Sequence, residues 1–471
     1  MIRGFLLIGS AALLSAGCSI YDSSLTANAT KKLGGGGNTG GSGEGQGGGA
    51  GQESGGGANQ SGGAGNAGGG GGSAGATSCN RKTYPRPPVD KNLGGDIEFV
   101  VIQSDIDLGD SEPSTVEAPT RFRQIGFDLD NVCTTTQNPR QQTSCTLPAA
   151  SDGVPDGPEG QDNAMGQVIQ ITRNLLTNFS SEIYTKQLRK GAANSILRVS
   201  NYNGKKDDDQ VKVEVMVSAR FNAFDAKATP KWDGTDTWPV AEDSVNDHSA
   251  MKPKNVDPLA YVSNGKLVAS LKDSGLRLLI GFTDTYTVNL TLFLHASFTV
   301  CDVVPTDAGQ YGFTLENCTL TGRWTADDLI KQLWHFPDPL DLNNPKPLCT
   351  NSTSYPGFKN TICSLRDITS SGTAGPTEPC DALSMAANFN TFPAKIGDVF
   401  SNDLYAPPCP ANANPANDSC ESEGGVAPIG MGGNTGSGGT SSSGGASGAS
   451  GKGGKGGQSS IPDGGPDAAQ N

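Results

Sequence analysis

Positive charge is scarce in this sequence. The chain has 34 Lys and Arg residues against 48 Asp and Glu residues, which gives a formal net charge of -14. Proteins that bind nucleic acid neutralise phosphates with clustered cations, so the charge balance argues against nucleic-acid binding. It argues equally against direct adsorption to anionic lipid, which depends on basic segments.

Histidine is also rare, with three residues in the whole chain. His248, His295 and His335 have no metal-ligand spacing to one another, and the sequence contains no His-Glu-x-x-His motif. The central part of the chain also lacks a Gly-x-Ser-x-Gly nucleophile elbow. Catalytic triads are defined by geometry and not by order, so a triad assembled in three dimensions stays open. The sequence assigns no catalytic residue.

The apolar run near the N-terminus, from Phe5 to Leu14, is too short to cross a bilayer core, which takes about 20 residues. It follows Arg3 and favours a cleaved signal over residues 1–17. The run ends in Leu14-Ser15-Ala16-Gly17-Cys18, which resembles the bacterial lipobox, with Ser15 where that motif usually has Leu. The resemblance implies that Cys18 is acylated and tethers the chain to a membrane. Ser19 after it favours the outer membrane or cell surface. The alternative is an ordinary secretory signal with an incidental Cys.

No Cys-x-x-Cys pair occurs among the 11 Cys residues, which argues against a zinc ribbon or a thioredoxin-type site. Setting Cys18 aside leaves an even number, which in an exported chain predicts disulfides. Connectivity does not follow from spacing alone. Short separations favour three pairs, namely Cys133–Cys145, Cys301–Cys318 and Cys409–Cys420.

Gly, Ser and other small or polar residues dominate two long segments. Residues 34–76 contain nothing that buries apolar area, so nothing offsets the entropy of ordering them. Residues 18–78 are therefore expected to be a lipidated N-terminus with a disordered tether. Residues 424–471 have a similar composition and are expected to be a disordered tail. The folded core is expected over residues 79–423, as one large domain or two closely packed ones.

Alternation of apolar and polar residues predicts β-strands in the core. The strongest pattern covers residues 286–300, as one very long strand or a hairpin, and residues 211–217 alternate in the same way. Asn203-Gly204 and Asn264-Gly265 have the composition of tight hairpin turns. The fold class is therefore mainly β with a few helices (α+β), an antiparallel sandwich or barrel. A sandwich of the lectin or laminin-G kind is a fold-class analogy. Shorter strands are expected at residues 97–102, 195–200, 276–282 and 312–321.

Helical spacing predicts a helix over residues 165–188, which residues 178–181 could split in two. A second helix is expected to begin after Thr325, whose side chain would cap it, with Asp328 at the third position. A third is expected from Cys380 through Leu383 to Phe389. Residues 337–379 are rich in Pro, Asn, Ser and Thr and predict a long loop pinned by disulfides.

An acidic pattern supplies the most specific candidate site. Asp128 and Asp130 precede Cys133, and residues 152–163 alternate Asp with Gly. Such spacing turns several oxygens toward one hard cation, which predicts a calcium site. Residues 152–163 also resemble the Asp-Gly-x-Pro-Asp-Gly stretches of thrombospondin type 3 repeats, as a single copy. The alternative is a solvated acidic loop in which Asp162 caps the following helix. The candidate ligands are Asp128, Asp130, Asp152, Asp156 and Asp162.

Two tryptophans, Trp232 and Trp238, flank the acidic residues Asp233 and Asp236. Exposed aromatic rings beside Asp are typical of a sugar-binding platform, whereas two partly buried loop anchors are the alternative. A hydrolase would need paired carboxylates. Such pairs arise by chance among so many acids and decide nothing.

The order of several short motifs resembles uncharacterised surface lipoproteins of myxobacteria that carry a Gly-rich tether. The motifs are Gly126-Phe127-Asp128-Leu129-Asp130, then Cys133, and Asp162-Asn163-Ala164-Met165-Gly166. Residues 322–329 and 363–384 fit the same pattern. The resemblance implies location and architecture and carries no function.

The expected function is a non-enzymatic surface module, tethered to the membrane by its N-terminal lipid, that binds a ligand such as a glycan or another surface protein. A secreted hydrolase acting on polysaccharide and a structural envelope or scaffold protein are the alternatives. Calcium is the only cofactor that the sequence suggests.

Overall fold

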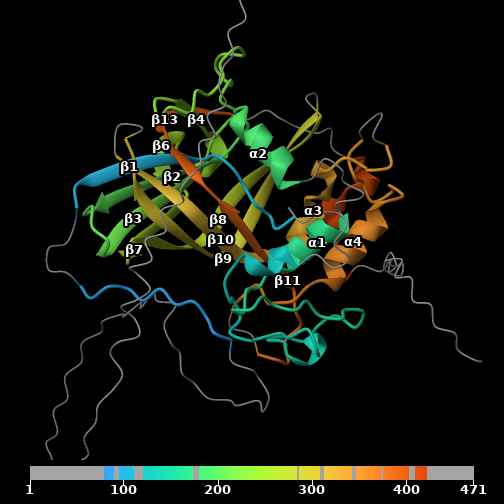
Figure 1. The fold of residues 1–471 in the computed structure, drawn as a ribbon. Coiled ribbons are helices and arrows are strands. Elements are labelled where there is room, and N and C mark those ends of the chain that lie inside the picture. Colours follow the sequence, from blue (N-terminus) through green and yellow to red (C-terminus); the bar gives the residue numbers. More distant parts are fainter. Residues whose placement is uncertain are drawn as a thin grey trace, which may run out of the picture. The chain divides into compact units, whose positions relative to one another are not determined.

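A nine-stranded antiparallel sheet organises the computed structural model of the protein (Figure 1). The structure describes residues 79–89, 95–110, 120–172, 180–283, 286–307, 312–341, 346–372, 375–401 and 409–421, without the side chains of 272–292. All of them belong to one unit, Gly62–Asn471. Cys18 and both Gly-rich segments lie outside the described residues. No helix among the described residues is long and apolar enough to cross a membrane.

Most elements of the described core are β-strands. The strands are β1 (Ile97–Gln103), β2 (Ser195–Tyr202), β3 (Asp208–Val217), β4 (Thr237–Ala241), β5 (Val245–Asn246), β6 (Ser249–Pro253), β7 (Asn255–Ser263), β8 (Lys266–Thr283), β9 (Tyr286–Pro305), β10 (Phe313–Thr325), β11 (Ala382–Phe389), β12 (Thr391–Pro393) and β13 (Lys395–Phe400). The α-helices are α1 (Ala164–Thr172), α2 (Ser181–Arg189), α3 (Ala326–Lys331) and α4 (Tyr355–Ser364).

The large sheet nearly closes on itself. Its strand order is β11-β10-β9-β8-β7-β3-β2-β1-β12, so the two end strands are consecutive in the chain. The segment after β1 continues along β11, where Asp107 forms an antiparallel bridge with Asn388. Inside, Thr391 at the start of β12 shares hydrogen bonds with Thr314 of β10. The predicted class of mainly β, antiparallel, sandwich or barrel, is confirmed.

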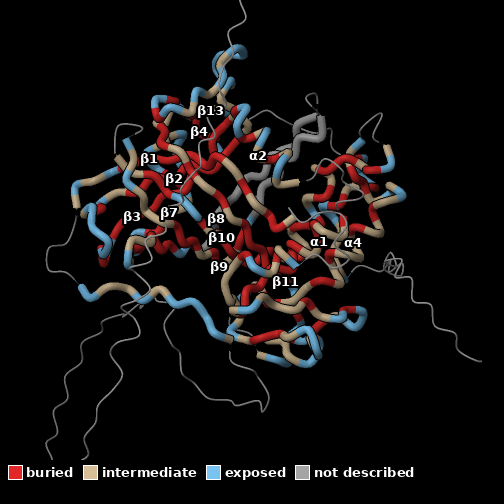
Figure 2. The backbone as a smooth tube through the Cα atoms, viewed as in Figure 1, coloured by how far each residue is buried: buried red, intermediate tan, exposed pale blue. Residues whose placement is uncertain are grey.

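Most of these strands contain buried residues (Figure 2). Their apolar side chains form the main core. Alternate residues on each strand point inward because side chains change face at every residue. The inward set on β3 is Val211, Val213 and Val215. The same core continues into α1, α3 and α4, which gather beside β11 (Figure 1).

The 20-residue strand β9 confirms one long strand over residues 286–300. The predicted face pattern is wrong beyond its middle. Leu294 is in the core, but so are Ser297 and Cys301, while Phe298 packs outside against Phe127. Ala296 has a φ of +47°, and the pairing with β10 shifts register at this point. A bulge therefore switches the inward face.

The hairpin turns and the first two helical predictions hold. Gly204 and Gly265 have positive φ at the turns after β2 and β7. The pattern over residues 165–188 is split into α1 and α2, with Ser180 capping α2 through Ile183 N. Thr325 caps α3 by accepting a hydrogen bond from Asp328 N.

The predicted third helix, from Cys380 to Phe389, is wrong, since this segment forms β11. It pairs with β10 along its whole length, from Cys318 opposite Phe389 to Thr325 opposite Ala382. Its apolar residues face both the core and a covered outer side, so their spacing did not separate strand from helix. The predicted loop over residues 337–379 is also partly wrong, because α4 lies within it.

Five disulfides stabilise the described core. Cys301–Cys318 is confirmed, whereas the predicted pairs Cys133–Cys145 and Cys409–Cys420 are wrong. Short loops close at less entropic cost, but chain pairing overrides that preference. Thr146, for example, exchanges backbone hydrogen bonds with the segment before β11, which places Cys145 beside Cys380. The other bonds are Cys79–Cys133, Cys145–Cys380, Cys349–Cys409 and Cys363–Cys420.

Candidate metal centre

The loop that contains Asp128 and Asp130 folds through its own carboxylates. Asn131 N donates to Asp128 Oδ1 over 2.6 Å, and Val132 N donates to Asp130 Oδ1 over 2.8 Å. Asn131 has a φ of +64°, a conformation that Asn tolerates better than most residues. Each Asp side chain thus closes its own turn by accepting a hydrogen bond from a backbone N–H two or three residues later, which accounts for the Asp-x-Asp spacing.

A second segment brings Asp156 and Asp162 against this loop. Asp162 Oδ2 accepts a hydrogen bond of 2.6 Å from Leu129 N, and Asp156 Oδ2 accepts one of 2.6 Å from Thr134 N. Each of these carboxylates thus has one oxygen engaged by backbone. Asp162 does not cap α1, as the solvated-loop alternative required. Asn163 caps it, since Asn163 Oδ1 accepts from Gly166 N.

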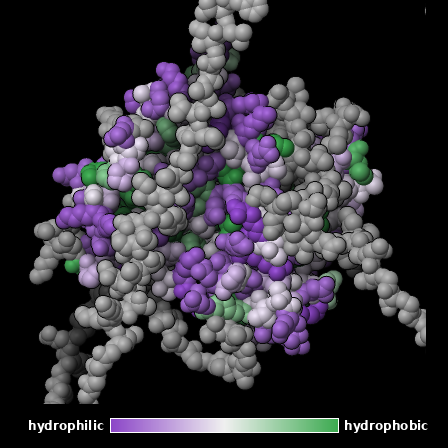
Figure 3. All heavy atoms as spheres, in the orientation of Figure 1, coloured by the Kyte–Doolittle hydropathy of each residue, from purple (hydrophilic) through white to green (hydrophobic). Residues whose placement is uncertain are grey.

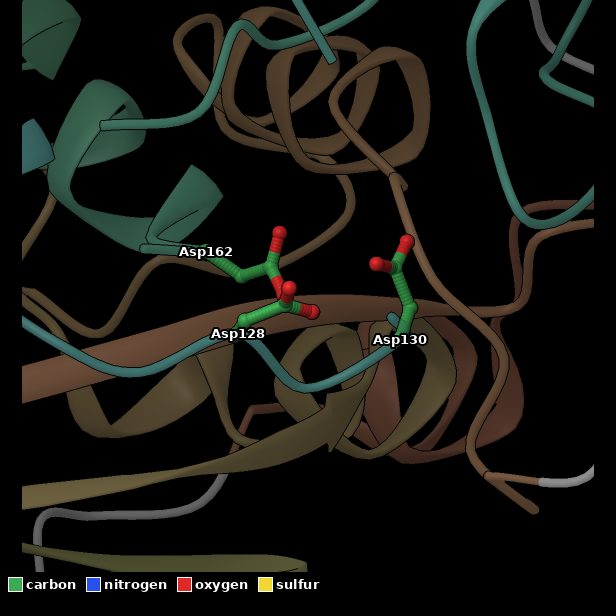
Figure 4. Close-up of side chains that lie close together, drawn as sticks. All are labelled: Asp128, Asp130 and Asp162. Carbon is green, nitrogen blue, oxygen red and sulfur yellow. The ribbon is translucent and has the colours of Figure 1, made fainter. Parts of the chain in front are cut away.

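Three of the five predicted ligands converge. Asp128, Asp130 and Asp162 each offer a carboxylate oxygen, and these oxygens all lie within 4.8 Å of one another (Figure 4). Asp162 is buried, and the Asp128 side chain is only 4% exposed. Asp156 shares a side-chain hydrogen bond with Asp162 and so borders the group. Asp152 is exposed and does not join it, which corrects that prediction.

Close packing around the carboxylates depends on glycine. A Cβ on Gly160 would lie 2.8 Å from Cys79 Sγ and 3.0 Å from Asp128 Oδ2, and its φ is +80°. The Asp-Gly alternation therefore serves backbone approach as much as ligand spacing. The Cys79–Cys133 disulfide joins the N-terminal segment to the end of the Asp128 loop at this point.

A fifth carboxylate, from Asp367, lies near the group, and the sequence reasoning missed it. It accepts hydrogen bonds from Ser384 N and Ser384 Oγ on β11, so its oxygens are engaged. Its charge raises the pKa of Asp162. Strands β2 to β10 lie between Asp162 and Asp367 in the sequence. Only the folded topology brings the two residues together.

Guanidinium groups compensate part of this negative charge. Arg81 forms an ion pair with Asp128, and Arg323 donates to Leu129 O and to Thr369 O. The charge of Arg323 favours the ionised form of Asp130, and Asp156 interacts with Arg123. Three guanidinium groups therefore face five carboxyl groups.

Burial shifts the titration of these acids upward. Burial, with the nearby charge of Asp130, raises the pKa of Asp128 to about 6 and that of Asp156 to about 8. Burial raises the pKa of Asp162 well above its usual range, and the charges of Asp130 and Asp156 add to the effect. Burial raises the pKa of Asp367 to about 7. Without a cation, the cluster therefore holds protons near neutral pH.

The donor set fits a hard divalent cation. Calcium takes six to eight oxygen ligands, with carboxylates preferred. Fully ionised, five carboxylates and three guanidinium groups sum to a charge of -2, which one divalent cation neutralises. Asp128, Asp130 and Asp162 would hold it, and Asp156 is the adjacent carboxylate. A cation bound there would replace protons as the compensating charge.

The predicted sugar platform of Trp232 and Trp238 is wrong. Trp238 is fully buried on β4, between the large sheet and the small sheets that cover its outer face. The Trp232 ring packs on Trp238 at 5.5 Å between centroids, and its Nε1 donates to Arg189 O over 3.0 Å. Trp238 is therefore a core residue of β4, and Trp232 anchors the preceding loop by packing against the same apolar cluster.

The three histidines do not assemble into a site in the described residues. His295 Nε2 lies 4.0 Å from Asp328, and His248 Nδ1 lies 3.3 Å from Glu242. His335 stacks on Trp334, with ring centroids 3.6 Å apart. Burial lowers the pKa of His335 to about 4, so this ring is neutral at physiological pH.

A scan against family models, a search of curated proteins and a search of solved structures each returned no match. The function is therefore inferred from the geometry of the acidic cluster.

Proposed function

We propose that the protein is an exported, lipid-anchored surface module that binds calcium at the acidic cluster and acts by binding a ligand and not by catalysis. The observation that carries the proposal is the convergence of Asp128, Asp130 and Asp162 within 4.8 Å. Their shared surroundings are two loops and a disulfide, so a cation there would link segments distant in sequence. Calcium would supply charge and cross-linking, with no chemical step of its own.

Two further features support export. The described core has five disulfides, which persist in oxidising compartments. The sequence before it has the signal-like run and Cys18. Outside the cell, calcium is at millimolar concentration, so even a weak site in the extracellular range would be filled.

Thermal unfolding of the purified protein in calcium and in chelator tests the metal. Calcium is expected to raise the midpoint, because a ligand that binds only the folded state stabilises it. Asp162→Asn should abolish the rise, whereas Asp152→Asn, an exposed residue of the same segment, should keep it. An unchanged wild-type midpoint, together with no metal by elemental analysis, would refute the calcium site.

Mass spectrometry of the N-terminal peptide from membranes tests the anchor. An acylated Cys18 is expected, and Cys18→Ser should release the protein from the membrane fraction. An unmodified N-terminus, or membrane association that survives Cys18→Ser, would contradict lipid anchoring.

A further inference from the structure

A polar cavity of about 420 Å³ lies beside the acidic cluster. Its size falls within the range of about 300–1,000 Å³ that is usual for small-molecule sites. Phe127 and Gln161 line the cavity, whereas their chain neighbours Asp128 and Asp162 belong to the cluster. The same two segments therefore contribute one residue to the cavity and the next to the candidate metal centre.

The floor of the cavity is fixed before any ligand arrives. Thr319 Oγ1 on β10 donates to Asn388 Oδ1 on β11 over 2.8 Å. Asn390 N donates to Asp105 Oδ1 over 2.7 Å, and Asn317 N donates to Asn390 Oδ1 over 2.9 Å. A preorganised wall loses little entropy on binding, which favours recognition of a small ligand.

The charged residues of the lining are already paired. Asp107 forms an ion pair with Arg121, and Lys82 Nζ lies 2.7 Å from Glu159. Asp105 Oδ2 lies 4.0 Å from Arg189 Nη2, and Asp105 also accepts hydrogen bonds from Asn390. The cavity therefore presents no uncompensated charge among the described residues, and it favours a neutral ligand over an anion or a cation.

Hydrogen-bonding groups remain open on this wall. Within the described residues, the Gln124 amide, the Tyr84 hydroxyl and the Asn388 Nδ2 group have no hydrogen-bond partner. Together they supply both donors and acceptors, the combination that hydroxyl groups require. The rings of Tyr84 and Phe127 meet edge to face at 5.8 Å and add an apolar surface. Mixed donors, acceptors and aromatic faces match a sugar ring, whose hydroxyls are polar and whose C–H face is apolar.

On the face drawn in Figure 3, hydrophobic residues form small separate patches.

We propose that this cavity binds a neutral carbohydrate of mono- or disaccharide size. The inference deepens the proposed function and depends on it in one respect. A cation held by Asp128 and Asp162 would order the segments that carry Phe127 and Gln161, so sugar binding should be stronger in calcium than in chelator.

Saturation-transfer NMR on the full chain in calcium tests the proposal, with free glucose, galactose, mannose, N-acetylglucosamine and their disaccharides as probes. At least one probe should bind. Gln124→Ala and Tyr84→Phe should each weaken binding about fivefold, the effect of losing one hydrogen bond. Tyr84→Phe leaves the backbone contact from Tyr261 to Tyr84 O in place. Gln141→Ala, at an exposed glutamine elsewhere, is the matched control and should bind as the wild type does.

Each other outcome has a definite meaning. No saccharide signal, or a signal that both variants leave unchanged, overturns the proposal. Preferential binding of inorganic phosphate or spermidine overturns the neutral-ligand assignment. The calcium shift in thermal unfolding, measured on the same samples, separates the two ideas. A shift without sugar binding refutes only the cavity proposal, and sugar binding without a shift refutes only the metal.

Discussion

Single carboxylates in the acidic cluster occupy positions that oppose their ionisation. Asp156 is the clearest case, since burial raises its pKa to about 8 while backbone holds one of its oxygens. The unfolded chain would titrate this group near pH 3.9. In metal-free protein the folded state therefore keeps a proton that the unfolded state loses.

Asp156→Asn should consequently change how stability depends on pH in chelator. A raised folded-state pKa gives stability that is present below about pH 4 and is lost as pH rises through about 8. The neutral amide removes this loss, so the variant should exceed the wild type by at least about 1 kcal/mol at pH 8.5. Urea unfolding at pH 5 and 8.5 measures the difference, with Asp152→Asn as control. A variant less stable than wild type at pH 8.5 would contradict the assignment.

The neutral ring of His335 predicts the opposite dependence on pH. Burial lowers its pKa to about 4, below the usual value near 6.5. The stability that it contributes is therefore present above about pH 6.5 and lost as pH falls toward 4. His335→Phe, which keeps a ring against Trp334, should lose less stability than the wild type between pH 7 and 4.5. Urea unfolding at several pH values measures the difference. The same loss of unfolding free energy in both proteins between pH 7 and 4.5 would show that the ring is not held neutral.

At the scale of elements, β11 shows how an edge strand is completed without a regular partner. The N–H groups on its outer edge donate to acceptors from outside the strand. Ser384 N donates to the Asp367 carboxylate, Ala386 N donates to Asn163 Oδ1, and Asn388 N donates to Asp107 O. Two side chains and one main-chain carbonyl replace the missing ladder, which protects an edge that would otherwise pair with another chain. The same contacts bring α1 and the acidic cluster to this edge.

Element prediction succeeded where one period dominated the sequence. Residues 211–217 and 286–300 alternate over long runs and have no competing helical pattern, so they read correctly as strands. The prediction for residues 380–389 failed because both faces of β11 are buried. Leu383, Met385 and Ala387 face the core, and Ala382 and Ala386 on the other face are also buried. Two covered faces remove the alternation on which the distinction depends.

Disulfides fix the order of the elements, and their contributions should differ with loop length. Cys145–Cys380 closes 235 residues, whereas Cys301–Cys318 closes 17 between neighbouring strands. The chain-entropy relation gives about 5 kcal/mol for the first and about 3 kcal/mol for the second. Replacing Cys145 and Cys380 by Ala should therefore lower the unfolding free energy more than the same change at Cys301 and Cys318. Equal losses in guanidinium titrations would contradict this order.

For the whole molecule, the sequence predicted the class of fold and the location of the candidate site but not its composition. Local spacing was enough for Asp128, Asp130 and Asp162, since two short acidic segments contain them. Arg323 on β10 pairs with Ser384 on β11, which donates to Asp367, so the pairing of these two strands brings both residues to the cluster, and no local signal marks them. The polar cavity is likewise assembled from β10, β11 and the N-terminal segment. Contacts between residues so far apart in the sequence are set by the topology of the fold and not by any local motif.

The central claim is that the acidic cluster binds one divalent cation in place of protons. Calorimetric titration of metal-free protein with calcium at pH 7.5, repeated in buffers of different ionisation enthalpy, measures both the number of sites and the protons released. One site per chain with net proton release is expected, because ligands must deprotonate to bind. Asp162→Asn should lose that site, and Asp152→Asn should keep it. No binding heat, or binding that Asp162→Asn leaves unchanged, would contradict a cation site at the acidic cluster.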